Sequence, residues 1–176
     1  MSLGPVRLGA AMVALLVATV SGCGLFGGPD PGPIGRGATE EVSESCLPAK
    51  DDGEYAMGFE VLNNPATDEA HLTGVSLVGA KDVRMVEAVV VDVVDSTSVG
   101  LQYWPPLISG TPQWTARVPH FGAVIPAKTQ TKNLVLHLET TGLPASLTGT
   151  RVAYEIDGHD YEFETGSALE IKDKCF

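Results

Sequence analysis

The residues of this chain whose side chains are best able to do chemistry are three cysteines and four histidines. They are Cys23, Cys46, Cys175, His71, His120, His137 and His159. Thiolates and imidazoles bind metals, and together they can form a nucleophilic site. Neither Cys46 nor Cys175 has a histidine or another cysteine at metal-ligand spacing, and the histidines are scattered along the chain. The sequence therefore predicts no compact metal or nucleophilic site from these residues.

Familiar catalytic motifs are missing as well. The sequence has no Gly-x-Ser-x-Gly, no phosphate-binding glycine loop and no His-Glu-x-x-His. Each histidine lies near the end of an expected strand or in a loop, where an isolated histidine is usually a polar surface group. We therefore expect no enzymatic activity, no catalytic residue and no cofactor.

Copper handling is the alternative function, because thioether and imidazole ligands suit copper(I). Residues 63–77 (NNPATDEAHLTGVSL), followed by Val86-Glu87, resemble the first hairpin of exported copper chaperones, which are small β-sandwich proteins. The later His-x-Met of that family is absent. Beyond residue 22 the methionines are Met57 and Met85. Both fall in strand patterns typical of core residues. A copper site would need both sulfurs and a histidine within a few ångströms.

Residues 1–22 have the pattern of a secretory signal peptide. Arg7 is the only charged residue before residue 30, and residues 8–20 (LGAAMVALLVATV) are apolar. This run is shorter than the ~20 residues that span a bilayer, and small residues follow it. A buried amphipathic helix is the alternative, but these apolar residues are continuous and do not form one face.

The quartet Val20-Ser21-Gly22-Cys23 stands at the boundary of this segment. It resembles the lipobox of bacterial lipoproteins, in which an aliphatic and two small residues precede an invariant cysteine. The resemblance implies that the chain is cut before Cys23 and that this thiol carries a diacylglyceryl group. Two acyl chains are enough for stable anchoring. The layout is similar to that of uncharacterised actinobacterial lipoproteins, which implies a place on the outer leaflet of the cell membrane and no particular activity.

With Cys23 assigned to lipid, Cys46 and Cys175 remain, and a pair of cysteines in an exported protein favours a disulfide. The bond would join the entry of the first strand to the end of the chain. It could stabilise the fold by ~4–5 kcal/mol on the chain-entropy model. A metal pair or two reactive thiols are the alternatives.

The charge of the chain limits its partners. Acidic residues outnumber basic ones 22 to 11, for a net charge of −11. No basic surface is available for phosphates, so we expect no nucleic acid and no electrostatic docking to anionic lipid. The expected partners are the membrane, through the lipid anchor, and an envelope protein.

Glycine and proline dominate residues 24–38, which predicts a flexible linker. Residues 39–45 continue it, so residues 23–45 form the expected tether. About 20 such residues have a root-mean-square reach of about 25 Å. The folded domain is then expected over residues 46–176.

That domain is predicted to be all-β, an immunoglobulin-like β-sandwich of about seven or eight strands. Alternating patterns predict strands at 55–62, 71–78 and 134–138, and a short last strand is expected at 167–171. The valine-rich residues 83–94 predict one strand or two separated by a kink, because valine opposes a helix there. Asp157-Gly158 predicts a type I′ turn that pairs Tyr154 with Tyr161 and places an apolar face inward. The acidic outer face of this hairpin is interpreted as solvated. Calcium binding is the alternative, although side chains along a flat strand do not converge easily on one ion.

Residues 101–121 do not fit the strand pattern. This stretch holds both tryptophans, and long loops in compact domains are often functional. Aromatic side chains there could form an interface. The candidate binding surface comprises Tyr103, Trp104, Trp114, His120 and Phe121. The alternative is a flap whose tryptophans pack over the open end of the sandwich.

Overall fold

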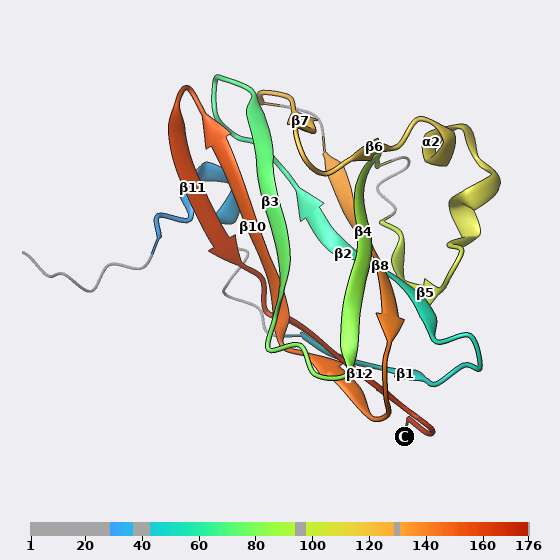
Figure 1. Cartoon of the computed structure of the whole chain (residues 1–176). Coiled ribbons are helices and arrows are strands. Elements are labelled where there is room, and N and C mark those ends of the chain that lie inside the picture. Colours follow the sequence, from blue (N-terminus) through green and yellow to red (C-terminus); the bar gives the residue numbers. More distant parts are fainter. Residues whose placement is uncertain (1–28, 37–42, 94–97, 129–130, 176) are drawn as a thin grey trace, which may run out of the picture.

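The computed structural model describes residues 29–36, 43–93, 98–128 and 131–175, and these form an all-β sandwich (Figure 1). The described residues contain twelve strands, more than the seven or eight predicted, and eight of them have six or more residues. These are β1 (Ser43–Pro48), β2 (Glu54–Leu62), β3 (Ala70–Val78), β4 (Val83–Asp92), β8 (Lys132–Thr140), β10 (Gly149–Ile156), β11 (His159–Glu164) and β12 (Ser167–Lys172). The four short ones are β5 (Gly100–Tyr103), β6 (Val118–Pro119), β7 (Val124–Ile125) and β9 (Ala145–Leu147).

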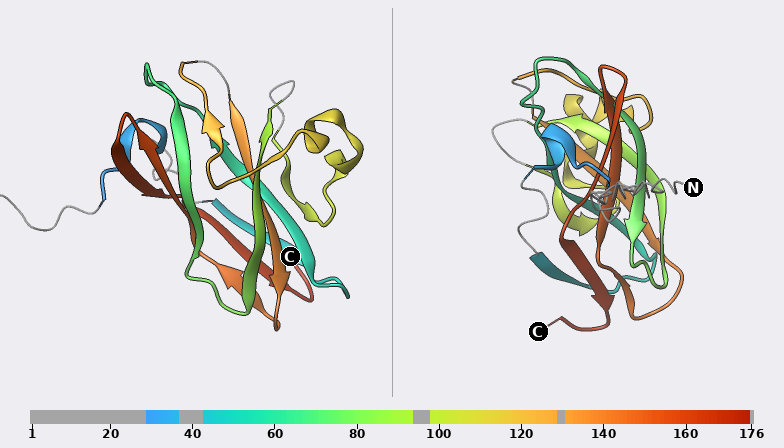
Figure 2. Two further views of the ribbon diagram at one scale, coloured as in Figure 1. Left: turned by 45° about the horizontal axis from the view of Figure 1, so that its top comes forward. Right: turned by 90° about the vertical axis from the view of Figure 1, so that its left-hand side faces the viewer.

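The strands form three sheets. A four-stranded sheet has the order β11-β10-β3-β7, and a five-stranded sheet has the order β5-β2-β8-β4-β6. These two pack face to face, as both views of Figure 2 show. The third sheet, β1-β12-β9, closes one end of the sandwich, and β1 runs parallel to β12.

The predicted hairpin has the predicted register. Tyr154 lies opposite Tyr161, and Ile156 lies opposite His159. Asp157 and Gly158 have φ angles of 50° and 73°, as a type I′ turn requires. On the inward face Val152, Tyr154, Ile156 and Phe163 are buried. On the outward face Arg151 pairs with Glu162 and Glu164.

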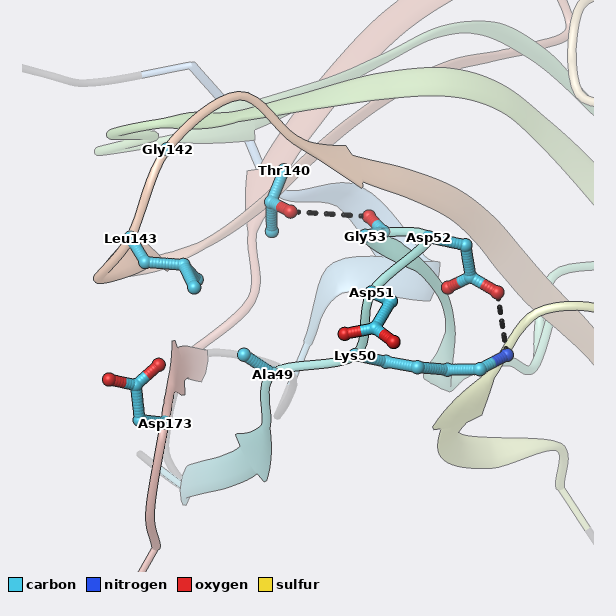
Figure 3. A pocket seen from close by; sticks show the side chains of 9 residues that line it. All are labelled: Ala49, Lys50, Asp51, Asp52, Gly53, Thr140, Gly142, Leu143 and Asp173. Carbon is cyan, nitrogen blue, oxygen red and sulfur yellow. Dashed lines mark hydrogen bonds and ion pairs between the residues drawn. The ribbon is translucent and has the colours of Figure 1, made fainter.

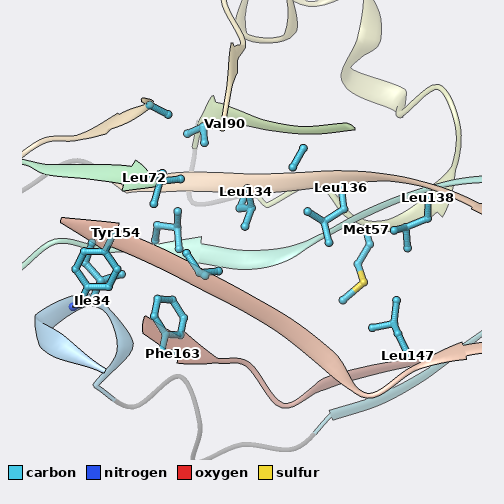
Figure 4. Close-up of a cluster of buried hydrophobic side chains, with 14 of the residues drawn as sticks. Ile34, Met57, Leu72, Val90, Leu134, Leu136, Leu138, Leu147, Tyr154 and Phe163 are labelled. Carbon is cyan, nitrogen blue, oxygen red and sulfur yellow. Dashed lines mark hydrogen bonds between the residues drawn. The ribbon is translucent and has the colours of Figure 1, made fainter. Parts of the chain in front are cut away.

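The main core lies between the sheets and is made by alternate residues of each strand (Figure 4). On β8, Leu134, Leu136 and Leu138 point into it and are almost completely buried. The β4 strand keeps its inward side chains aligned by a register shift between Met85 and Glu87. The valine-rich stretch is thus one strand that contains a bulge, and not two strands separated by a kink.

Cys46 and Cys175 lie at disulfide distance, with their Cα atoms 5.8 Å apart. The bond joins β1 to the segment after β12, as expected. The closed end of the sandwich is thus tied covalently as well as by the parallel pairing of β1 with β12.

The tether is where the structure differs from the prediction. The first strand begins at Ser43, inside the predicted linker, because its backbone pairs with β12. Residues 29–36 also pack on the domain and contain a short helix, α1 (Gly32–Gly35). The expected signal peptide and Cys23 lie outside the described residues.

Candidate functional site

Residues 104–117, here called the flap, cover the outer face of the five-stranded sheet. They contain a 3-10 turn, η1 (Leu107–Gly110), and a short helix, α2 (Pro112–Thr115). Small and β-branched residues on the outward face of β2, β4 and β8 form a second apolar cluster with the flap. Its buried members are Ala56, Val89, Val91, Trp114 and Val135.

Local hydrogen bonds give the flap its shape. The Thr111 hydroxyl accepts a hydrogen bond from the Trp114 N–H at 3.3 Å and caps α2, which starts with proline. The Gln102 amide holds the other end, because its oxygen accepts from the Leu107 N–H at 2.7 Å and its nitrogen donates to the Val99 carbonyl at 2.7 Å. The flap is therefore an ordered cover.

Both tryptophans point toward the sheet. Trp114 is 6% exposed and meets Trp104 edge-to-face, with ring centroids 5.5 Å apart. The Arg117 guanidinium lies over the Trp114 ring, 4.8 Å from its centre. This corrects the candidate binding surface, from which Trp114 is removed. The flap alternative describes these indoles better, although they cover a sheet face and not the open end.

His137 lies beneath the flap. Its ring stacks on Trp104, with centroids 3.9 Å apart and planes within 4° of parallel. Its Nε2 is 3.8 Å from a Glu54 carboxylate oxygen and has no hydrogen-bond partner, and its Nδ1 is 4.0 Å from a Glu87 oxygen. The expectation that every histidine is a surface group is thus wrong for His137, which is buried at the middle of β8. The sequence does hold a signal for this buried position. His137 alternates with the core leucines of β8, so it lies on the opposite face of the strand, and the two tryptophans of residues 101–121 need a sheet face to cover.

The other members of the candidate surface are more accessible. Tyr103 is 39% exposed, and Phe121 is 74% exposed in the turn between β6 and β7. His120 is half-buried, and its Nδ1 lies 3.1 Å from the Ala88 carbonyl. These residues lie at different places around the flap and do not converge on one point with it. What they provide is apolar contact area.

The residues of a copper site are not brought together. Met57 and Met85 pair with Leu136 and Leu138 of β8, so both sulfurs belong to the main core. His137 is on the opposite face of β8. Within the described ranges, no three histidine, cysteine or acidic side chains are grouped so as to hold a metal ion. No observation therefore favours copper handling.

An open pocket of about 550 Å³ lies at the turn before β2, and three of its nine lining residues are aspartates (Figure 3). Asp51 and Asp173 stand on different walls. Lys50 binds Asp52 at 2.6 Å, and this hydrogen bond lowers the pKa of the Asp52 carboxyl and raises that of Lys50. Because these groups are well exposed, the pocket is a solvated acidic surface and shows no built ligand site.

No family model matches the chain, and no curated protein matches it. Across the described residues, no helix has the length and apolar character that crossing a membrane requires.

Proposed function

We propose that this chain is a lipoprotein held on the outer leaflet of a bacterial cell membrane, where its β-sandwich is a binding or structural module. The observation that carries the proposal is the order Val20-Ser21-Gly22-Cys23 directly after the apolar run. The pairing of Cys46 with Cys175 supports it, because the disulfide of the domain is complete without Cys23. A disulfide also suits an oxidising extracytoplasmic compartment.

The most suitable contact residue is Phe121. Backbone hydrogen bonds hold the residues on either side of it, from the His120 N–H to the Ala88 carbonyl at 3.0 Å and from the Gly122 N–H to the Leu72 carbonyl at 2.8 Å. The turn is thereby fixed to both sheets. An exposed aromatic side chain on a rigid turn loses little entropy on binding, which supports an envelope protein as the partner.

The lipid anchor is tested by producing the full chain in a bacterium fed an alkyne-tagged palmitate. We expect the wild type to incorporate the label and to fractionate with membranes, and Cys23→Ala to do neither. Cys46→Ala is the matched control, since it should lose the disulfide and keep the label. Equal labelling or equal fractionation of the wild type and Cys23→Ala would overturn the anchor.

The binding surface is tested in the same cells with a photo-crosslinking amino acid at Val124, which is 37% exposed close to Phe121. We expect an adduct with one envelope protein that Phe121→Asp abolishes. Leu143→Asp, at a side chain 50% exposed elsewhere, should leave the adduct unchanged. An adduct that survives Phe121→Asp would rule out this surface, and the absence of any adduct would favour a purely structural module.

A further inference from the structure

The described segment 29–36, here called the strap, lies along the outer edge of β11. The Glu162 N–H of that strand donates a hydrogen bond to the Asp30 carbonyl at 3.0 Å. The Asp30 side chain accepts a second one from the Gly32 N–H at 2.9 Å, which starts the turn of α1. The strap therefore satisfies one backbone N–H on a sheet edge that would otherwise be open to solvent.

A buried tyrosine clamps the middle of the strap. The Tyr154 hydroxyl donates to the Pro31 carbonyl at 2.7 Å and accepts from the Ile34 N–H at 3.0 Å. Burial raises the pKa of this hydroxyl, so it keeps the proton that it donates. Ile34 is 8% exposed and belongs to the main core (Figure 4).

Two glycines let the strap lie flush on the aromatic surface. Gly32 has a φ of 60°, and a Cβ there would lie 2.2 Å from the Tyr154 hydroxyl. A Cβ on Gly35 would lie 2.6 Å from Phe163. These glycines thus serve a close fit, and residues 29–36 are not part of a free linker.

The docked strap shortens the tether. Only residues 24–28 separate Cys23 from Pro29. Six Cα-to-Cα steps extend to at most about 20 Å, whereas the full stretch from Cys23 to Ser43 could extend to about 65 Å. On the basis of the proposed lipid anchor, we infer that the strap holds the β10–β11 side of the sandwich next to the bilayer and directs the flap away from it.

The opposite placement of strap and flap makes this a defined orientation. In Figure 1 and in the left view of Figure 2, α1 lies beside β11 at one side of the sandwich and α2 lies at the other. The membrane-facing edge carries Asp160, Glu162 and Glu164. Acidic groups are not attracted to anionic headgroups, so lipid attraction does not supply the orientation and the strap must.

The test uses the full lipidated chain in phosphatidylcholine vesicles that contain an acceptor dye on the headgroups. A donor dye is attached through an unnatural amino acid at Asp160, on β11, or at Leu107, which is 91% exposed on the flap. We expect higher energy transfer from position 160 than from position 107. The double variant Gly32→Ala/Gly35→Ala should release the strap and abolish that difference.

Gly110→Ala is the matched control, because a Cβ there meets nothing within 4 Å, and it should preserve the difference. Tyr154→Phe offers a second release that adds no atoms. Equal transfer from the two positions in the wild type, or an unchanged difference after release, would overturn the orientation while leaving the anchor intact. Failure of the wild type to bind vesicles would overturn the anchor, and the orientation with it.

Discussion

The flap and the strap contain little regular secondary structure, and each covers one side of the same sandwich. They are held there by different interactions. The flap is held by side chains: Trp104 stacks on His137, and Trp114 fills the apolar cluster over the sheet. The strap is held by backbone hydrogen bonds and by the buried Ile34 side chain. Its backbone lies so close to Tyr154 at Gly32, and to Phe163 at Gly35, that neither glycine can carry a Cβ without displacing a neighbour.

This difference explains why one segment stands out in the sequence and the other resembles a linker. Large aromatic residues in a loop indicate that the loop packs against another part of the protein, because their side chains favour burial. A Gly/Pro-rich stretch has the same composition whether it is free or fitted to a surface, because glycine serves both purposes. A fitted segment is recognised only by the group that it contacts, which here is the Tyr154 hydroxyl.

The largest change in stability is expected from a substitution in the flap, which side chains hold. Trp114→Ala should lower the free energy of unfolding by about 3–5 kcal/mol, because it empties the centre of the second cluster. The measurement is urea denaturation followed by circular dichroism. Leu107→Ala, at an exposed position of the same flap, should change the value by less than about 0.5 kcal/mol. A loss below about 1 kcal/mol for Trp114→Ala would mean that the flap is only loosely held.

The strap should respond to the loss of a single oxygen. Tyr154→Phe keeps the ring but leaves the Ile34 N–H and the Pro31 carbonyl without their partner. We expect a cost of about 1–3 kcal/mol, seen as faster hydrogen exchange of the Ile34 amide. Tyr103→Phe is the control, since that hydroxyl makes only a 3.4 Å contact with Pro48. Unchanged exchange at Ile34 would show that the hydroxyl does not hold the strap.

Two variants separate the contribution of His137 stacking to stability from the contribution of its ring nitrogens. His137→Ala removes the platform under Trp104 and should cost about 1–2 kcal/mol. His137→Phe keeps a ring and removes a buried nitrogen that has no hydrogen-bond partner, so stability should stay within about 0.5 kcal/mol of the wild type or rise. Thermal melts of the two variants decide this, and equal losses would show that stacking does not matter.

The smallest expected effect is a loss of folding stability at alkaline pH, through the Tyr154 hydroxyl that holds the strap. Burial raises the pKa of Tyr154 above the ordinary tyrosine value of about 10. The unfolded chain therefore loses this proton first, and the stability contribution is lost as the pH rises from about 10 through the folded pKa. Urea midpoints between about pH 9 and pH 11.5 should fall further for the wild type than for Tyr154→Phe. Parallel curves would contradict this linkage.

The elements with local sequence signals could be predicted before the fold was known. The all-β class, the Asp157-Gly158 turn and the alternation along β8 all follow from residue type and spacing, because a strand has a side-chain period of two and a type I′ turn needs positive φ. The cysteine pairing was also predictable, because only two thiols remained once Cys23 was assigned to lipid. The lipid assignment itself stays a prediction.

Which loops cover a sheet and which surfaces stay open depends on contacts between segments far apart in the chain. The tertiary structure buried Trp114 and His137, left Phe121 outside, and fitted the strap to Tyr154. It also made β1 a strand, since the pairing of this segment with β12 joins residues more than 120 positions apart. Such contacts depend on which faces meet in space, and no local pattern of residues encodes that meeting.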